Sequence, residues 1–332
     1  MRRYVLAALL LFSCSGALPV SGTDAGPRNS TAGDAGADGG SLPDGGSVGD
    51  GGSGSDGGSL ADGEATLIAQ RPYPLHVPAG YDPHQPTPLV IMLHGYGANA
   101  AGEEAYFKLT PVSDAQTFLY AMPNGTVDAA GHRFWNATDT CCDFFHTGVD
   151  DVAYVNAIID DVQARFNLDP KRVYVVGHSN GAFLAQRLAC DLSTRIAAIV
   201  SLAGAQWKDQ RHCRPTEPVA ALEVHGTADS VVLYGGGTDL DGLTVPAYPG
   251  AEETVADWAT HDGCAAALAD TGTRLDLDST LDGDETEVWE HANCPPGGAA
   301  ELWKIDGGAH IPTLTSQWGE LIWRFFAAHP KP

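Results

Sequence analysis

Residues 172–184 read Arg-Val-Tyr-Val-Val-Gly-His-Ser-Asn-Gly-Ala-Phe-Leu, and this segment is the strongest indication of the chain's architecture. Residues 172–176 predict a strand that runs into Gly177, and residues 182–188 have helical character. The turn between them carries Ser179, and its glycines, Gly177 and Gly181, let the chain turn tightly without side-chain clashes. A strand, a tight turn and a helix in succession form the repeating unit of a parallel sheet that is covered by helices.

The same alternation of strands and helices continues on both sides of this turn. Further strands are predicted at residues 89–93, 118–122, 197–202, 219–224, 286–290 and 302–305. Further helices are predicted at residues 151–166, with Asp150 or Asp151 as the N-cap, at 252–261 and at 314–328. This pattern predicts an α/β fold in which a mostly parallel central sheet has helices on both faces. Active sites in such sheets lie beyond the carboxyl ends of the strands.

The composition divides the 332 residues into three parts. Residues 1–14 join Arg2 and Arg3 to a short apolar run, which predicts an export signal. The run ends Leu-Phe-Ser-Cys, so Cys14 is the candidate lipidation site of a bacterial lipobox; the alternative is an ordinary cleaved signal with an incidental cysteine. Residues 15–65 are rich in Gly, Asp and Ser and predict a disordered linker, because they hold too few apolar side chains to offset the entropy of ordering. Residues 66–332 are predicted to form one folded domain.

The Asp-Gly phrases of the linker and the net charge of the chain each bear on which functions are excluded. The Asp-Gly phrases of the linker are irregularly spaced, which argues against calcium-binding repeats. The chain has a net charge of −24, of which the linker holds −7 and the signal +2, so the folded part carries −19. Such a charge argues against nucleic acid or an anionic membrane surface as a partner, and leaves a membrane only through a lipid at Cys14. The sequence does not specify an oligomeric state.

The cysteines predict disulfides. Apart from Cys14 the chain has six cysteines. An even number of cysteines that follow an export signal is expected of a disulfide framework. They are Cys141, Cys142, Cys190, Cys213, Cys264 and Cys294. Their spacing leaves the pairing open, since six cysteines allow about fifteen connectivities. No Cys/His spacing is typical of a metal site, so neither a metal nor a cofactor is expected.

The turn at residues 177–181 matches the pattern G-x-S-x-G, which makes Ser179 the candidate nucleophile. The candidate acid is Asp229, directly after the strand at 219–224, and the candidate general base is His310, after the last strand. In this arrangement the carboxylate accepts the Nδ1 proton of the histidine, and the histidine accepts the serine proton. The alternatives are Asp239 and Asp241 for the acid and His291 and His329 for the base.

The candidate oxyanion donors are two backbone N–H groups. One belongs to Tyr96, in the His-Gly-Tyr-Gly loop after the strand at 89–93, and the other belongs to Asn180, which follows the nucleophile. The order Ser, Asp, His along the chain is the order of the α/β-hydrolase fold.

Together these motifs resemble those of the exported polyhydroxybutyrate depolymerase-like and feruloyl esterases, which have that fold. The similarity covers residues 73–326. The matching stretches are Leu-His-Gly at 93–95, Cys-Cys at 141–142, Val-Asp-Asp-Val at 149–152, Gly-His-Ser-Asn-Gly-Ala at 177–182, Leu-Ala-Cys at 188–190, His-Gly-Thr-Ala-Asp at 225–229 and Gly-Gly-Ala-His at 307–310.

The resemblance implies ester hydrolysis through an acyl-enzyme on Ser179. Its implied substrates are feruloyl or acetyl esters of plant polysaccharide, or short polyhydroxyalkanoate esters. It also implies that Cys264 pairs with Cys294, and that Cys190 and Cys213 pair with the two cysteines at 141–142 in an unspecified order. An alternative function is a catalytically inactive lipoprotein of this fold that binds polysaccharide, although an intact Ser, Asp and His argue against it.

The chain departs from the family near the histidine. Ala309 replaces a glycine, and Ile311-Pro312-Thr313 follows where members often have a tryptophan, so the specificity of those members does not transfer. Trp135 and Trp207 are therefore the candidates for an aromatic wall against a phenolic or sugar group.

Overall fold

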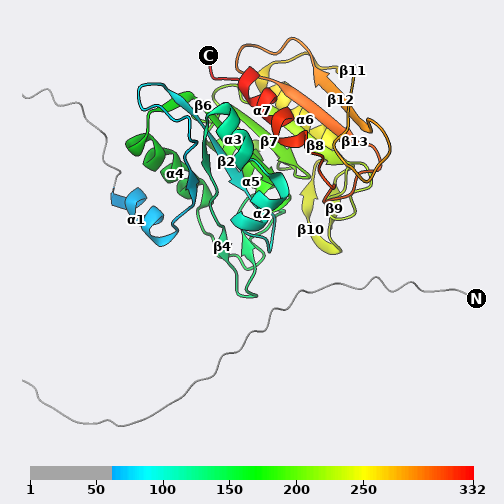
Figure 1. Ribbon diagram of the computed structural model, residues 1–332. Helices are drawn as coiled ribbons and strands as arrows, with labels where there is room; N and C mark the ends of the chain where they lie inside the picture. Colours follow the sequence, from blue (N-terminus) through cyan, green and yellow to red (C-terminus); the bar gives the residue numbers. More distant parts are fainter. Residues whose placement is uncertain (1–61) are drawn as a thin grey trace, which may run out of the picture. The chain divides into compact units, whose positions relative to one another are not determined.

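The computed structural model describes residues 62–332 (Figure 1). The predicted signal with Cys14, and residues 15–61 of the predicted linker, lie outside this part of the chain. Helix α1 (Asp62–Gln70) spans the junction between the predicted linker and the predicted domain. Leu67 and Ile68 of this helix pack against the main hydrophobic core.

A nine-stranded sheet runs through the domain in the order β1-β3-β2-β6-β7-β8-β13-β12-β11. Neighbouring strands from β3 to β13 pair in parallel, whereas β1, β12 and β11 pair antiparallel with their neighbours at the two edges. The prediction of a mostly parallel sheet is therefore confirmed. The strands are β1 (Leu75–His76), β2 (Thr87–Leu93), β3 (Leu119–Ala121), β6 (Leu168–His178), β7 (Ala198–Leu202), β8 (Ala220–Gly226), β11 (Leu268–Leu275), β12 (Thr286–His291) and β13 (Ala300–Ile305).

Helices cover both faces of this sheet (Figure 1). They are α2 (Ala100–Phe107), α3 (Thr110–Gln116), α4 (Asp151–Arg165), α5 (Asn180–Asp191), α6 (Ala251–Asp262) and α7 (Trp318–Ala328). Strand β2 shows why the central strands are continuously apolar: Leu89, Ile91 and Leu93 enter the core under α4, α5 and α6, while Val90 and Met92 enter the core under α7. A strand that is buried on both faces therefore consists mainly of apolar residues.

The starts of two helices can be compared with the positions predicted from the sequence. Asp150, one of the two candidate caps, is the N-cap of α4. Its side chain accepts a hydrogen bond from the backbone N–H of Ala153. Helix α7 begins at Trp318 instead of the predicted residue 314. Leu314 instead forms an isolated β-bridge with Asp278, which takes the chain before α7 out of the helical conformation.

Two short hairpins and a single 3-10 turn had no clear sequence signal. The hairpins are β4 (Thr126–Val127) with β5 (Arg133–Phe134), and β9 (Gly237–Leu240) with β10 (Leu243–Tyr248); the turn is Gln210–His212. Most residues of β9 and β10 are exposed or half-buried, so these strands lack the apolar run that marks the central ones. Among residues 62–332, no helix has the length and apolar character needed to cross a bilayer.

The three disulfides differ in part from the pairing that the resemblance implied. Cys264 pairs with Cys294 as expected, but Cys141 pairs with Cys142 and Cys190 pairs with Cys213. The prediction that Cys190 and Cys213 bond to the two adjacent cysteines is therefore wrong. Cys190 ends the buried face of α5 and lies against the loop of Cys213, whereas the adjacent cysteines lie beside the start of the same helix, next to Asn180.

Removing the Cys190–Cys213 disulfide is expected to destabilise the protein by about 3.5 kcal/mol, because it opens a loop of about two dozen residues in the unfolded chain. The measurement is urea unfolding of the full chain with Cys190→Ala and Cys213→Ala. The matched variant, Cys141→Ala with Cys142→Ala, removes as many sulfur atoms but opens no loop, so its loss is smaller. Equal losses in the two variants would contradict the assignment.

Candidate active site

Ser179 stands at the junction between β6 and α5, where close backbone packing fixes the turn. Its backbone has φ 53° and ψ −121°, an uncommon conformation for a residue with a side chain. A Cβ atom at Gly177 would overlap the backbone of Gly181, and a Cβ atom at Gly181 would overlap the carbonyl group of Leu93 in β2. Both glycines are therefore required by contact distance, and the turn they permit holds the Ser179 hydroxyl at the end of the sheet.

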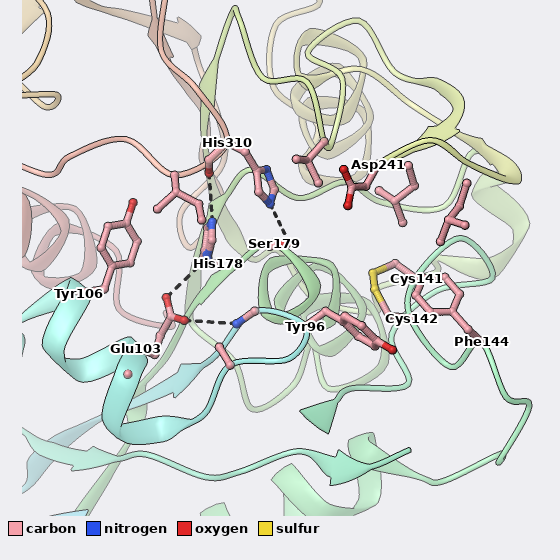
Figure 2. A pocket seen from close by; sticks show the side chains of 17 residues that line it. Tyr96, Glu103, Tyr106, Cys141, Cys142, Phe144, His178, Ser179, Asp241 and His310 are labelled. Carbon is pink, nitrogen blue, oxygen red and sulfur yellow. Dashed lines mark hydrogen bonds and ion pairs between the residues drawn. A yellow bond between two sulfur atoms is a disulfide. The ribbon is translucent and has the colours of Figure 1, made fainter. Parts of the chain in front are cut away.

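The structure brings Ser179, His310 and Asp229 into one hydrogen-bonded chain. Nε2 of His310 lies 2.9 Å from the Ser179 Oγ, and Nδ1 lies 2.8 Å from Oδ2 of Asp229 (Figure 2 shows the serine contact). Because a carboxylate only accepts, the ring proton sits on Nδ1, and Nε2 accepts from the serine hydroxyl. The three residues follow β6, β13 and β8, whose carboxyl ends lie at one edge of the sheet.

Asp229 is held as a carboxylate in a buried position. Its Oδ1 accepts hydrogen bonds from the backbone N–H groups of Val231 at 2.8 Å and Val232 at 3.0 Å. Burial acts to raise the pKa of Asp229, but hydrogen bonds and positive charge from His225 and His310 hold that pKa well below its usual range. The group is therefore ionised throughout the neutral range and orients the ring of His310.

None of the four residues considered as alternatives for the acid or the base forms part of this hydrogen-bonded chain. Oδ1 of Asp239 accepts from the backbone N–H of Gly242 within the β9–β10 hairpin, and Asp241 lies at the rim of the pocket without a bond to the His310 ring. His291 bonds through Nδ1 to the carbonyl oxygen of Ala265. His329 bonds through Nδ1 to a carbonyl oxygen in the last turn of α7.

The two backbone groups predicted as oxyanion donors lie beside Ser179. Gly95 packs so closely against the nucleophile turn that a Cβ atom there would lie 3.5 Å from the Cβ of Ser179, which places the Gly95–Tyr96 turn next to the hydroxyl. Within the described part of the chain, the N–H groups of Tyr96 and Asn180 have no hydrogen-bond acceptor. The phenol of Tyr96 is anchored separately, since it donates to Oδ2 of Asp128 at 2.6 Å.

Trp135 does not form part of an aromatic wall. It is fully buried, and its indole N–H donates to the carbonyl oxygen of His94 at 2.9 Å, below the Gly95–Tyr96 turn. The Asn180 side chain also holds its backbone, because Oδ1 accepts from the Trp135 N–H and Nδ2 donates to the Trp135 carbonyl oxygen. Asn180 thus ties the start of α5 to the segment beneath the turn, a role that the motif did not predict.

Trp207 is also absent from the residues that line the pocket. It is buried, and its ring stacks on His212 at a centroid distance of 6.2 Å, beyond the end of β7. Both tryptophan assignments are therefore corrected: these side chains fill apolar space, and the wall of the pocket is made by other residues.

A cavity of about 600 Å³ opens on both sides of Ser179. Figure 2 shows Glu103 and Tyr106 on one side, and the Cys141–Cys142 disulfide with Phe144 on the other. The mouth is apolar and exposed, with Phe144, Leu243 and Ile311 lining it. Within residues 62–332, no group of three or more His, Cys, Asp or Glu side chains is placed to hold a metal ion.

A buried polar link, also missed at the sequence level, joins the loops on either side of the pocket. Oε2 of Glu103 accepts from the backbone N–H of Gly95 at 3.2 Å, and Oε1 lies 3.8 Å from Nδ1 of His178. Nε2 of His178 lies 3.0 Å from the carbonyl oxygen of His310, so this nitrogen donates. Burial raises the pKa of Glu103 to about 8 and lowers the pKa of His178 to about 3, so both groups are neutral at pH 7.

The chain is similar in sequence to known feruloyl esterases. Feruloyl esterase B from Piromyces equi is 28% identical over 238 residues, which are 70% of this chain and 41% of the relative. Feruloyl esterase D from Neurospora crassa is 24% identical over 255 residues, 73% of this chain and 74% of the relative. The chain thus spans less than half of the length of the Piromyces relative.

A solved structure shares the fold. The acetyl xylan esterase from Aspergillus awamori superposes with a TM-score of 0.52 at 13% identity, over 76% of this chain and 93% of that one. This likeness confirms the α/β-hydrolase fold. Residues 71–275 match the esterase PHB depolymerase family, a stretch that contains the Ser179 turn and Asp229. Because the match extends over more than half of the 332 residues, the chain belongs to the esterase PHB depolymerase family.

Proposed function

We propose that the protein is an exported serine esterase that hydrolyses carboxylic esters through an acyl-enzyme. The observation that carries this proposal is the unbroken chain from the Ser179 hydroxyl through His310 to the buried carboxylate of Asp229, at the centre of an open apolar cavity. The membership of an esterase family supports it.

The geometry supports a two-step reaction. Ser179 Oγ attacks the ester carbonyl carbon while its proton passes to Nε2 of His310, and the oxyanion accepts hydrogen bonds from the N–H groups of Tyr96 and Asn180. The intermediate then expels the alcohol, which takes the proton from His310. A water molecule next attacks the acyl group, gives a proton to His310 and releases the acid, and the proton returns to Ser179 Oγ.

The cavity and the names of the relatives support a proposal for the substrate class. An apolar wall with a neutral Glu103 and His178 suits an uncharged acyl group, and the open mouth admits a bulky alcohol such as a sugar. Relatives are named as feruloyl and acetylxylan esterases. We therefore assign feruloyl or acetyl esters of plant polysaccharide, or short polyhydroxyalkanoate esters, as substrates, and a screen on methyl ferulate, acetylated xylan and short polyhydroxybutyrate distinguishes them.

A second candidate function is a binding protein that has lost catalysis. It requires a broken site, whereas His310 of this chain is within hydrogen-bonding distance of both Ser179 and Asp229. The esterase is therefore the better-supported function.

Ser179→Ala is expected to lower kcat for p-nitrophenyl butyrate by at least about 10⁴-fold, because the variant has no hydroxyl to form the acyl-enzyme. The measurement is steady-state hydrolysis at pH 7.5, with circular dichroism to show that the variant is folded. Thr260→Ala, which removes an exposed hydroxyl on α6, is the control and keeps wild-type activity. Undiminished hydrolysis in the Ser179 variant would remove the proposal.

We expect kcat/KM to decrease at alkaline pH because Glu103 becomes ionised. Because its pKa is raised to about 8, the carboxyl is neutral below that pH and becomes an anion above it, beside Gly95 and facing His178 and Tyr106. That charge opposes the developing oxyanion, so kcat/KM falls as the pH rises through 8.

The matching variant is Glu103→Gln, whose amide oxygen still accepts from Gly95 but does not ionise. It is expected to keep its activity at pH 9 after correction for spontaneous hydrolysis. Glu253→Gln, at an exposed ion pair with Lys208, is the control and retains the wild-type limit. An identical alkaline limit in the Glu103 variant would disprove this origin.

Export and attachment to the cell envelope are part of the proposal. The support is the sequence of residues 1–14, with two arginines, an apolar run and Cys14. The lipidated cysteine would anchor the domain through residues 15–61. Metabolic labelling of a bacterial host with a palmitate analogue is expected to tag the wild-type chain and not Cys14→Ser. An unlabelled, freely secreted wild-type product would show that the signal is an ordinary cleaved one.

A further inference from the structure

His225 lies in β8, four residues before Asp229, and is only 1% exposed. It contacts neither the pocket nor Ser179. Its Nδ1 lies 3.0 Å from Oε1 of Glu223, and its Nε2 lies 2.8 Å from the carbonyl oxygen of Val232 and 3.3 Å from Oδ2 of Asp229. Both ring nitrogens therefore face oxygen atoms, and the Nε2 partner at 2.8 Å is a carbonyl that only accepts.

The neighbours of Glu223 fix the direction of the hydrogen bond at one of its two oxygens. The indole N–H of Trp258 is a donor only, so the atom of Gln186 that faces it at 2.6 Å is the amide oxygen. The amide nitrogen of Gln186 then donates to Oε2 of Glu223 at 3.0 Å. Glu223, which is 1% exposed, thus accepts at one oxygen and has its other oxygen against the ring of His225.

We infer that His225 is a buried imidazolium, held between Glu223 and Asp229, and that it acts as the positioning residue for the proposed triad. With a proton on each nitrogen, the ring donates to Glu223 on one side and to the Val232 carbonyl on the other, and its charge lies beside Oδ2 of Asp229 at 3.3 Å. Burial lowers the pKa of His225, but its hydrogen bonds to Asp229 and Glu223 dominate and raise that pKa to about 10.

The other groups around the ring agree with this charge. Tyr234 meets it edge to face at a centroid distance of 5.8 Å, and its phenol, whose pKa burial raises, stays neutral and donates to Glu252 at 3.0 Å. His310 lies on the far side of Asp229 and bonds to the same oxygen, Oδ2. Oδ2 of Asp229 therefore accepts the Nδ1–H of His310 and lies 3.3 Å from the Nε2 of His225 on its other side.

This arrangement has two consequences for catalysis, and both rest on the proposed esterase function. The imidazolium stabilises the ionised form of Asp229 in a buried position, where an isolated carboxylate would be costly. It also helps to hold the pKa of Asp229 well below its usual range, so this carboxylate stays charged and keeps orienting the His310 ring at mildly acidic pH.

The test is the double variant Glu223→Gln with His225→Gln. Two amides can bond to each other and to Gln186, so the pair is replaced without an isolated buried charge, and unfolding is checked by thermal melting. We expect kcat to fall by about 10- to 100-fold through loss of alignment. We also expect the acid limb of the kcat/KM profile to move to higher pH, because the cation that helps to hold the pKa of Asp229 below its usual range is gone.

A matched control is His291→Gln, which replaces another buried histidine that touches no catalytic residue, and it keeps the wild-type acid limb. A readout that needs no activity is ¹⁵N NMR of the wild-type ring at pH 8, which is expected to show both nitrogens of His225 protonated. A neutral ring, or an unshifted acid limb in a folded double variant, would overturn this inference alone. Failure of the esterase proposal itself would show instead as unchanged hydrolysis in Ser179→Ala.

Discussion

Backbone contact between β2, β6 and the start of α5 is the constraint on which the site depends. At Gly177 and Gly181 there is no space for a Cβ atom, since it would overlap the carbonyl groups of Gly181 and Leu93. The same contact that exposes the Ser179 hydroxyl thus presses the end of β2 against it. The N–H groups that face the hydroxyl and the hydroxyl itself are positioned together, so neither depends on a flexible side chain.

The acid and the base are joined by a comparable constraint at the neighbouring strands. β8 and β13 pair in parallel with Ile305 opposite Gly226, and beyond them the N–H of Ala228 donates to the carbonyl oxygen of Gly308 at 2.9 Å. These bonds bring Asp229 and His310 together across 81 positions of sequence. The buried carboxylate then needs a balancing charge, which the inferred imidazolium of His225 supplies at 3.3 Å, while the ring of His310 bonds to it from the other side.

Sequence reasoning succeeded where one local pattern determines the structure. A strand, a Gly-x-Ser-x-Gly turn and a helix predicted both the parallel sheet and the meeting place of Ser179, Asp229 and His310. It failed where the outcome depends on contacts between distant segments. The pairing of Cys141 with Cys142 and the burial of Trp135 under the His94 carbonyl are set by packing, and no spacing indicates them. Glu103 and His225 were missed for the same reason, although His225 stands inside the His-Gly-Thr-Ala-Asp motif itself.

The distribution of charge fits the proposed reaction, in which a neutral ester is converted into an anion. The inner wall of the cavity is neutral at pH 7, while residues 66–332 carry −19 and Asp241 stands at the rim. An uncharged ester approaches such a surface without repulsion, whereas the released carboxylic acid ionises and is repelled by it. Screening by salt limits the range of this repulsion to about 10 Å at 0.1 M, so the carboxylates nearest the mouth matter most. The acidic surface therefore favours release of the product, and binding of the substrate is left to the apolar wall.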